Sequence, residues 1–148
     1  MSSALTLRDA TSADLDQIMR LYLHLSPNNH PVERSTAQAI FQKFEQFDGS
    51  AILLGEIGQR LVSSCTVVVI PNLTRHGKPY ALIENVVTHA DYRGRGYGTQ
   101  LLNAATERAW SSGCYKVMLM TGSTEPATLA FYENAGFAQT KTGFQKRR

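Results

Sequence analysis

The sequence predicts an α/β fold whose single domain, residues 1–148, contains a mixed sheet with flanking helices. Three patterns support this prediction. Two segments rich in branched apolar residues, 51–57 and 60–70, are joined by a two-residue turn with glycine, which is typical of a hairpin. A third such segment, 80–88, runs through a glycine-rich loop into a helical pattern and then into segment 115–121. A strand, a helix and a strand in this order indicate a parallel βαβ crossover after an antiparallel N-terminal meander.

The chain begins with a short strand, 5–8, and a first amphipathic helix. Thr11 and Asp14 have the spacing of a capping box. The helix ends before Pro27, and its apolar stripe consists of Leu15, Ile18, Met19, Tyr22 and Leu25.

A second helix is expected to begin at a cap on Ser35 and to stop at Asp48-Gly49. Its apolar residues are Ile40, Phe41, Phe44 and Phe47. The loop between the two helices, 26–31, has the proline and asparagine content of a turn. Together these segments form either a lid over a site or a connector.

The middle of the chain is expected to form three consecutive antiparallel strands. The hairpin of 51–57 and 60–70 is followed by a turn-rich basic loop, 71–79, which leads into the strand at 80–88.

The glycine-rich loop between the strand and the helix predicts a phosphate-binding site. The first turn of a helix has backbone N–H groups without a partner inside the helix, and the helix dipole adds positive charge there. Gly94, Gly96 and Gly98 let a ligand approach the backbone, and Arg93 and Arg95 add full positive charge. The expected ligand is a pyrophosphate, and the alternative is a tight turn with solvated arginines. The spacing matches neither the P-loop pattern nor the dinucleotide fingerprint.

The helix that this loop opens has one apolar face, formed by Tyr97, Leu101, Leu102, Ala105 and Ala109.

The C-terminal part adds a strand and a helix. The preceding helix ends near Gly113, and segment 115–121 returns parallel to 80–88. Pro126 in a first turn predicts a last helix, with Leu129, Tyr132 and Ala135 on one side. Segment 137–144 is expected to add one or two short strands.

Composition excludes several classes of protein. A hydrophobic content of 43% predicts a folded chain. The first seven residues lack the apolar run of a signal peptide, and no segment has the roughly 18 continuous apolar residues of a membrane helix, so we expect a cytoplasmic protein without a membrane partner. The net charge of +3 comes with no nucleic-acid-binding motif. Cys65 and Cys114 are expected to be reduced core thiols rather than a disulfide. The four histidines are scattered, so no metal site is expected.

Several motifs resemble those of the GNAT superfamily of N-acetyltransferases and occur in the same order. Arg93-x-x-Gly96-x-Gly98 resembles the acetyl-CoA signature of that family. The others are Ile83-Glu84-Asn85-Val86-Val87, Gly113-Cys114-Tyr115-Lys116-Val117 and Phe131-Tyr132-Glu133-Asn134-Ala135-Gly136-Phe137. The set looks most like the small branch that includes glucosamine-phosphate acetyltransferases. The resemblance implies two parallel strands that splay apart, so that the pantetheine arm of the cofactor enters the gap.

The resemblance implies an enzyme that transfers the acetyl group of acetyl-CoA to the primary amine of a small molecule. Its cofactor residues fall into two groups. The backbone of Val86, Val87 and Thr88 would pair with the pantetheine amides. The pyrophosphate would be held by Arg93, Gly94, Arg95, Gly96, Tyr97, Gly98 and Thr99. Thr128 stands near the place where many family members have a cofactor-binding asparagine.

Two residues are candidates for catalysis. Glu84 lies in an otherwise apolar strand, where a carboxylate is costly unless it is paired or useful, so it is the candidate base for the amine proton. A structural ion pair is the alternative role. The resemblance gives Tyr132 the position of the acid that protonates the departing thiolate, and a packing tyrosine is the alternative. Asn85 replaces an aspartate of the sugar-phosphate branch, so it can orient a substrate but cannot accept a proton.

The acceptor amine is less defined. Asn85, His30 and Thr121 are the candidate substrate-binding residues, and basic residues such as Arg75 would meet an anionic group on the amine. Met120 and Thr121 replace an acidic-polar pair of the sugar-phosphate branch. Two other functions stay open, a protein or peptide N-acetyltransferase and a non-catalytic acyl-CoA-binding regulatory module. The family also points to a homodimer.

Overall fold

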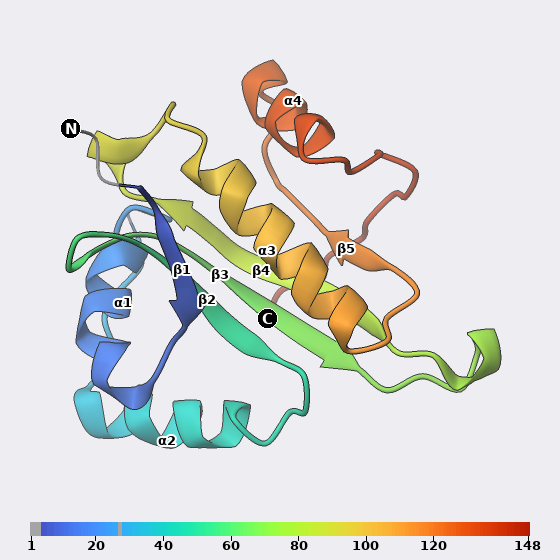
Figure 1. Cartoon of the computed structure of the whole chain (residues 1–148), viewed down its shortest axis with the longest axis horizontal. Helices are drawn as coiled ribbons and strands as arrows, with labels where there is room; N and C mark the ends of the chain where they lie inside the picture. Colours follow the sequence, from blue (N-terminus) through green and yellow to red (C-terminus); the bar gives the residue numbers. More distant parts are fainter. Residues whose placement is uncertain (1–3, 27) are drawn as a thin grey trace.

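The computed structural model describes residues 4–26 and 28–148, and its centre is one five-stranded sheet. The strands lie in the order of the chain: β1 Thr6–Asp9, β2 Ala51–Ile57, β3 Arg60–Ile70, β4 Tyr80–Thr88 and β5 Val117–Leu119. Neighbouring strands from β1 to β4 are antiparallel, and β5 is parallel to β4 (Figure 1). The predicted mixed sheet, with its meander and its parallel crossover, is therefore confirmed.

Four α-helices flank the sheet in the described part of the chain. They are α1 Leu15–Tyr22, α2 Arg34–Phe44, α3 Tyr97–Ser111 and α4 Pro126–Asn134. Leu53 of β2 belongs to the core beneath α3, whereas its neighbour Leu54 packs with Ile18 of α1. Because successive strand residues point to opposite faces, α1 and α3 cover opposite sides of the sheet.

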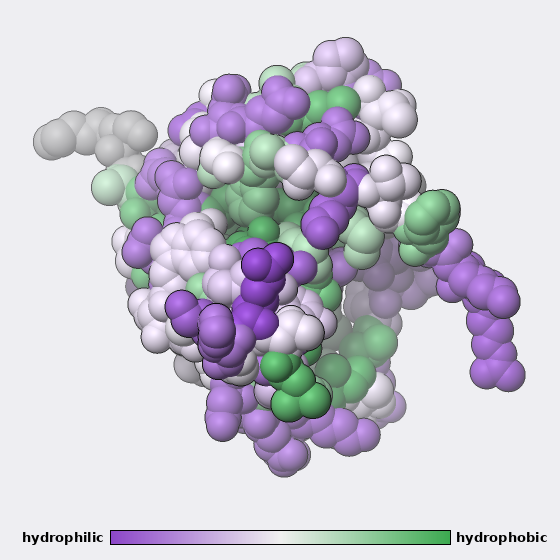
Figure 2. Space-filling model, turned by 90° about the vertical axis from the view of Figure 1, so that its right-hand side faces the viewer, coloured by the Kyte–Doolittle hydropathy of each residue, from purple (hydrophilic) through white to green (hydrophobic). Residues whose placement is uncertain are grey.

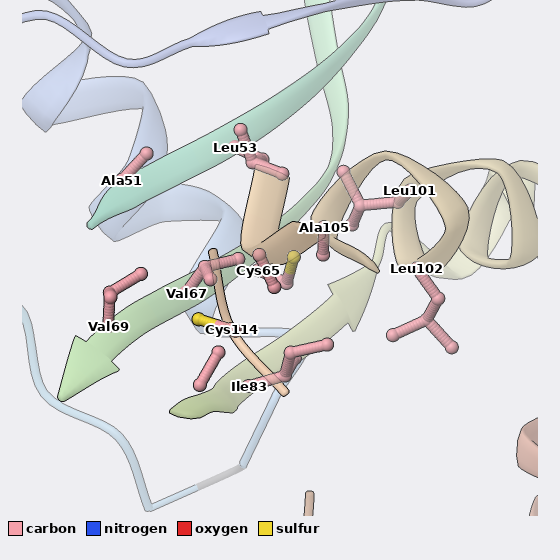
Figure 3. Packing of buried hydrophobic residues seen from close by; sticks show 12 residues of the cluster. Ala51, Leu53, Cys65, Val67, Val69, Ile83, Leu101, Leu102, Ala105 and Cys114 are labelled. Atoms are coloured by element: carbon pink, nitrogen blue, oxygen red, sulfur yellow. The ribbon is translucent and has the colours of Figure 1, made fainter. Parts of the chain in front are cut away.

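The main hydrophobic core lies between α3 and strands β2 to β4. Figure 3 shows Ala105 of α3 over Cys65 of β3, with Leu53 and Ile83 from the neighbouring strands on either side. The whole predicted apolar face of α3 is buried. Cys65 and Cys114 are free and buried, as predicted.

The second helix differs from its prediction at both the cap and the face. It begins at Arg34, with Glu33 in the cap position, two residues earlier than a cap on Ser35 would give. Its buried residues are Ala37 and Phe41, which pack against Leu15. The helix contacts the rest of the protein along a narrow stripe, so the predicted apolar face is only partly buried. Ile40 is 55% exposed and Phe47 is 56% exposed. Helix α1 ends at Tyr22, so it stops short of Leu25, the last residue of its predicted stripe, and Pro27 itself lies outside the described residues.

The C-terminal strands are shorter than the sequence suggested. Strand β5 has three residues, not the seven of segment 115–121. Segment 137–144 forms no strand, and Phe144 is 95% exposed. A segment becomes a strand only when a partner edge is available, and the three residues of β5 offer little edge within the described residues. Figure 2 shows the hydrophilic chain end projecting from the body of the molecule.

In the described residues, no helix is long and apolar enough to cross a membrane. The same part of the chain contains no group of three or more His, Cys, Asp or Glu side chains that could hold a metal ion. The expected cytoplasmic location and the expected absence of a metal stay predictions.

A charged cluster joins the start of the sheet to α1. Arg8 on β1 donates to both carboxylate oxygens of Asp14, at 2.8 and 2.7 Å, and to Glu56 on β2 at 2.7 Å. The backbone N–H of Thr11 also donates to Asp14, which completes the predicted capping box. The bonds from Arg8 lower the pKa of the Asp14 carboxyl to about 2.

We predict that Asp14→Asn lowers the free energy of unfolding by about 2 kcal/mol at pH 7, because it removes charge-assisted hydrogen bonds from a buried group. The folded pKa lies below the unfolded value of 3.8, so the contribution of the carboxylate is present above pH 3.8. It is lost as the pH falls through about 2. Urea unfolding of both proteins at several pH values measures the difference.

The matched control is Asp16→Asn. Asp16 forms an exposed ion pair with Arg34 at 3.4 Å, so its replacement should change stability by less than about 0.5 kcal/mol. Equal effects of the two substitutions would contradict the role given to Asp14.

Candidate active site

The candidate site begins where β4 and β5 part. Their parallel pairing covers three positions and ends at Ile83 and Leu119. Strand β4 continues for five more residues to Thr88 and is paired there with β3 on its other side. The edge of β4 that faces away from β3 is therefore without a strand partner over Val86 and Val87. This is the splayed geometry that the sequence predicted.

A bulge at Asn85 shapes this unpaired half of β4. Asn85 has φ +53°, in the left-handed region, where most L-residues lose about 1–2 kcal/mol and asparagine loses less. The register between β3 and β4 shifts at this point, where Ser64 pairs with Val87 but Thr66 pairs with Glu84. A bulge bends a strand and redirects its backbone groups. The sequence marked Asn85 for its side chain, but its backbone conformation gives it a further role.

The backbone conformation at two positions of the loop favours glycine. Gly94 has φ +75°, and Gly96 has φ +80° in the cap position of α3. No other group lies within 4 Å of the place where a Cβ would stand at either residue. The space around them is open, and the loop delivers the chain into a 15-residue helix whose first N–H groups have no partner inside the helix. A phosphate fits such a helix start.

Gly98 has a role that the sequence did not predict. A Cβ there would stand 2.9 Å from the ring of Phe131 on α4. This glycine therefore also lets α4 pack closely against the first turn of α3. Tyr97 likewise has its side chain buried in the core, so only its backbone is available to a ligand.

The two arginines of the loop are held by backbone carbonyls. Arg93 donates from Nε to the carbonyl of Thr88 and from Nη2 to the carbonyl of His24, both at 3.1 Å. It thereby ties the end of β4 to the turn after α1. Arg95 donates to the carbonyl of Asp91 at 3.1 Å and lies over the ring of Tyr92. Both guanidinium groups remain exposed at the helix start and supply positive charge.

Glu84 is exposed, which corrects the argument that made it a candidate. Its carboxylate is not buried, so it needs no compensating partner. Glu84 is paired in register with Thr66, and directly paired residues share a face of the sheet. It therefore projects on the side of the sheet covered by α1.

Tyr22 of α1, which the sequence placed only in the apolar stripe of the first helix, brings a polar hydroxyl to that same face. Burial raises the pKa of Tyr22, and the nearby hydroxyls of Thr66 and Ser64 offset part of that rise. The run Ser63-Ser64-Cys65-Thr66 interrupts an otherwise apolar strand and was the sequence signal for this polar patch.

Tyr132 lies on α4 and is half-buried. Its ring packs beside Phe131, with 4.9 Å between the ring centroids, and against the main core cluster. Val86 of β4 and Leu119 of β5 pack against the same cluster. Burial raises the pKa of its phenol, so the hydroxyl keeps its proton at neutral pH.

The remaining candidates are more scattered. Thr128 is half-buried in the first turn of α4, where its N–H donates to the carbonyl of Glu125. Thr121 is exposed just after β5, and its hydroxyl accepts from the N–H of Ser123 at 3.1 Å. His30 is exposed in the loop between α1 and α2. Thr128 lies one turn before Tyr132 on α4, whereas no described contact joins Thr121 or His30 to Glu84 or Tyr132.

Comparisons with known proteins agree with this geometry. The sequence profile described as the Acetyltransferase (GNAT) family matches residues 15–137. A putative acetyltransferase from Agrobacterium tumefaciens str. C58 has a similar solved structure, with a TM-score of 0.91 and 43% identity. That match covers 97% of this chain and 99% of the other.

Two curated relatives have named small-molecule substrates. A glucosamine 6-phosphate N-acetyltransferase from Trypanosoma brucei brucei is 40% identical over 78 residues, which are 53% of this chain and 51% of the relative. The chain thus spans about half the length of that protein. An L-methionine sulfoximine/L-methionine sulfone acetyltransferase from Pseudomonas paraeruginosa is 27% identical over 139 residues, covering 89% of this chain and 79% of the relative.

We predict that a carboxylate at position 96 blocks the helix start. Asparagine and aspartate are of equal size and both tolerate positive φ, so Gly96→Asn and Gly96→Asp form a matched pair. Calorimetry should show that the Asp variant binds CoA at least about tenfold more weakly than the Asn variant, because only the carboxylate repels a pyrophosphate. Equal affinities of the two variants for CoA would contradict the placement of the pyrophosphate at this loop.

Proposed function

The chain belongs to the GNAT family of acetyltransferases, and we propose that it transfers the acetyl group of acetyl-CoA directly to the primary amine of a small molecule. The observation that carries this proposal is the unpaired half of β4 next to the first turn of α3. The unpaired half of β4 offers backbone groups to an extended chain, and the first turn of α3 offers N–H groups to a phosphate.

Acetyl-CoA has both of the features that these elements would bind. The amides of its pantetheine arm would pair with the backbone of Val86, Val87 and Thr88, as an added strand pairs with a sheet edge. Its pyrophosphate would lie at residues 94–99, where the left-handed glycines and the helix start leave open space. The thioester would then lie in the gap between β4 and β5, beside Tyr132.

The names of the relatives favour a small amine as the acceptor. Glucosamine 6-phosphate and methionine sulfoximine are both small amines with additional polar groups. The acceptor would approach from the side of the sheet covered by α1, where Glu84, Thr66 and Tyr22 lie. Asn85 and His30 would contribute from the rim of this face, and Thr121 from the end of β5. The basic loop at residues 71–79, with Arg75 and Lys78, precedes β4 and lies at the opposite end of that strand from Thr88, so it does not serve this site as the sequence suggested.

The chemistry needs a base for the amine and an acid for the thiolate. An alkyl amine has a pKa near ~10.4 and arrives mostly protonated. Glu84, with an exposed carboxylate beside the gap, would accept this proton directly or through water. The neutral amine attacks the thioester carbon, and the tetrahedral intermediate expels the thiolate of CoA. The phenol of Tyr132 would donate the proton that completes the thiol.

The proposal competes with two other functions. A protein or peptide acetyltransferase would use the same cofactor, and a regulatory module would bind acyl-CoA without turning it over. A screen for thiol release from acetyl-CoA with a panel of small amines and a panel of peptides separates the three. We expect release with a small amine. Release with peptides alone, or cofactor binding without release, would contradict the proposal.

The homodimer also remains a proposal. It would cover apolar side chains that are exposed in the single chain, among them Phe144 and Met120, which are 95% and 67% exposed. Light scattering of the purified protein tests it, and a mass of one chain would exclude it.

We predict that Glu84→Gln lowers kcat/KM and removes the acidic limb of its pH profile, because the amide cannot accept a proton. The control is Glu107→Gln on the exposed side of α3, which should leave the profile unchanged. An acidic limb that persists in Glu84→Gln would show that the base is another group.

We predict that Tyr132→Phe lowers kcat by about 100-fold while the affinity for CoA changes little. The substitution keeps the ring and its packing and removes only the hydroxyl. Loss of a general acid reduces rates by ~100- to 10,000-fold, and a thiol is a good leaving group, so the low end applies. Tyr115→Phe is the matched control, since that ring lies beside Arg75 at the far end of the sheet. A kcat within about threefold of the original would make Tyr132 a packing residue.

A further inference from the structure

A second concave surface lies at the left-hand edge of the molecule in Figure 1, where the end of α1, the β2–β3 hairpin and the turn after β4 meet. Its volume is about 380 Å³, which is in the range of small-ligand sites. Four side chains with N–H donors line it: Arg20 and His24 from α1 and the turn after it, Arg60 from β3 and His89 from the turn after β4. We refer to these four residues as the basic pocket.

The positive charge of the basic pocket is largely unmatched. In the described part of the chain, neither Arg20 nor Arg60 nor His24 has a carboxylate within 4.0 Å. Among the described ion pairs, the one at the pocket joins Nδ1 of His89 to the carboxylate of Asp91 at 3.9 Å, and the Asp91 side chain is 79% exposed. Such an excess of one sign in a concave surface attracts a counter-ion.

A contact between two donors indicates where that ion would bind. Nδ1 of His89 accepts from the N–H of Asp91 at 3.1 Å, so the neutral ring carries its proton on Nε2. Nε2 lies 3.1 Å from Nη2 of Arg60, which can only donate. In the tautomer that accepts from Asp91, and in the protonated ring, both atoms are donors, and an anion beside the pair would accept from both.

The ring of His24 adds a third donor to the same place. It stacks on His89 with 4.0 Å between the ring centroids. Its Nδ1 accepts from the N–H of Ala90 at 3.3 Å, which leaves the proton on Nε2. Burial, His24 and Arg60 together lower the pKa of His89, as expected for a ring in a positive field.

We propose that the basic pocket binds the dianion of a phosphate monoester. The terminal oxygens of a phosphate can accept hydrogen bonds from two guanidinium groups and two imidazole N–H groups at once. The double negative charge of the phosphate also matches the positive charges of the two unpaired guanidinium groups. Tyr92 connects the pocket to the loop at residues 93–99, because Arg60 and Arg95 lie over its ring at 5.4 and 5.1 Å. The phosphate could belong to a separate small molecule or be the 3′-phosphate of CoA, and the second source rests on the proposed function.

The test uses inorganic phosphate and the proton NMR signals of the histidine rings. Phosphate, compared with chloride at equal ionic strength, should raise the pKa of His89, because an anion stabilises the imidazolium form, and should shift the ring signals of His24. The signal of His76, in the 71–79 loop at the other end of the sheet, should not move. No rise for His89, or an equal rise for His76, would overturn the proposal.

Two variants and one control locate the binding. Arg60→Gln and Arg20→Gln should each weaken phosphate binding at least about tenfold, since each removes a charge-assisted hydrogen bond. Both side chains are exposed, so the fold should survive either change, and unchanged signals of His30 and His76 verify it. Arg75→Gln, in the basic loop at the opposite end, should bind phosphate normally. Phosphate binding that survives both pocket variants would contradict the proposal.

A competition experiment distinguishes the two sources. If CoA displaces phosphate and 3′-dephospho-CoA does not, the pocket holds the 3′-phosphate of the cofactor. If neither displaces it, the ligand is a separate phosphate monoester. Displacement by both would place the phosphate in the loop at residues 93–99 and overturn the proposal. None of these measurements involves acetyl transfer, so they can succeed or fail independently of the proposed function.

Discussion

The early parting of β4 from β5 is the constraint on which the rest of this structure depends. Three paired residues hold β5 to the sheet, and beyond Ile83 the strand β4 has a free edge. The bulge at Asn85 sits at the start of this free half, and Arg93 fastens its far end through the carbonyl of Thr88. Helix α3 packs across β3 and β4, so that its first turn reaches the same end of the sheet. A cofactor-binding edge and an anion-binding helix start are thus supplied by one strand–loop–helix unit.

The sequence predicted the elements that depend on local pattern. Strands β2, β3 and β4, the apolar face of α3 and the start of α4 at Pro126 all agree with the structure. Their signals are periodicity, turn chemistry and a proline, which act within a few residues. Segment 137–144 was predicted to be a strand as well, but no edge in the described part of the chain pairs with it. Pattern alone does not reveal whether a partner exists.

The site was predictable only in part, because its geometry depends on contacts between distant segments. The motif pointed to Gly98 as a ligand contact but not to its packing against Phe131, far along the chain. The expected burial of Glu84 was wrong, since its place in an apolar strand says nothing of which face is open. Tyr22 and the stacked pair His24 and His89 come from segments with no recognisable motif.

The central claim is that acetyl-CoA lies along the free half of β4 and reaches the start of α3. Amide hydrogen exchange of the whole chain, with and without acetyl-CoA, tests it most directly. The account predicts slower exchange in two separate segments, residues 86–88 and residues 96–99, with little change in β1 and β2. Protection confined to other parts of the chain, or to only one of the two segments, would contradict it.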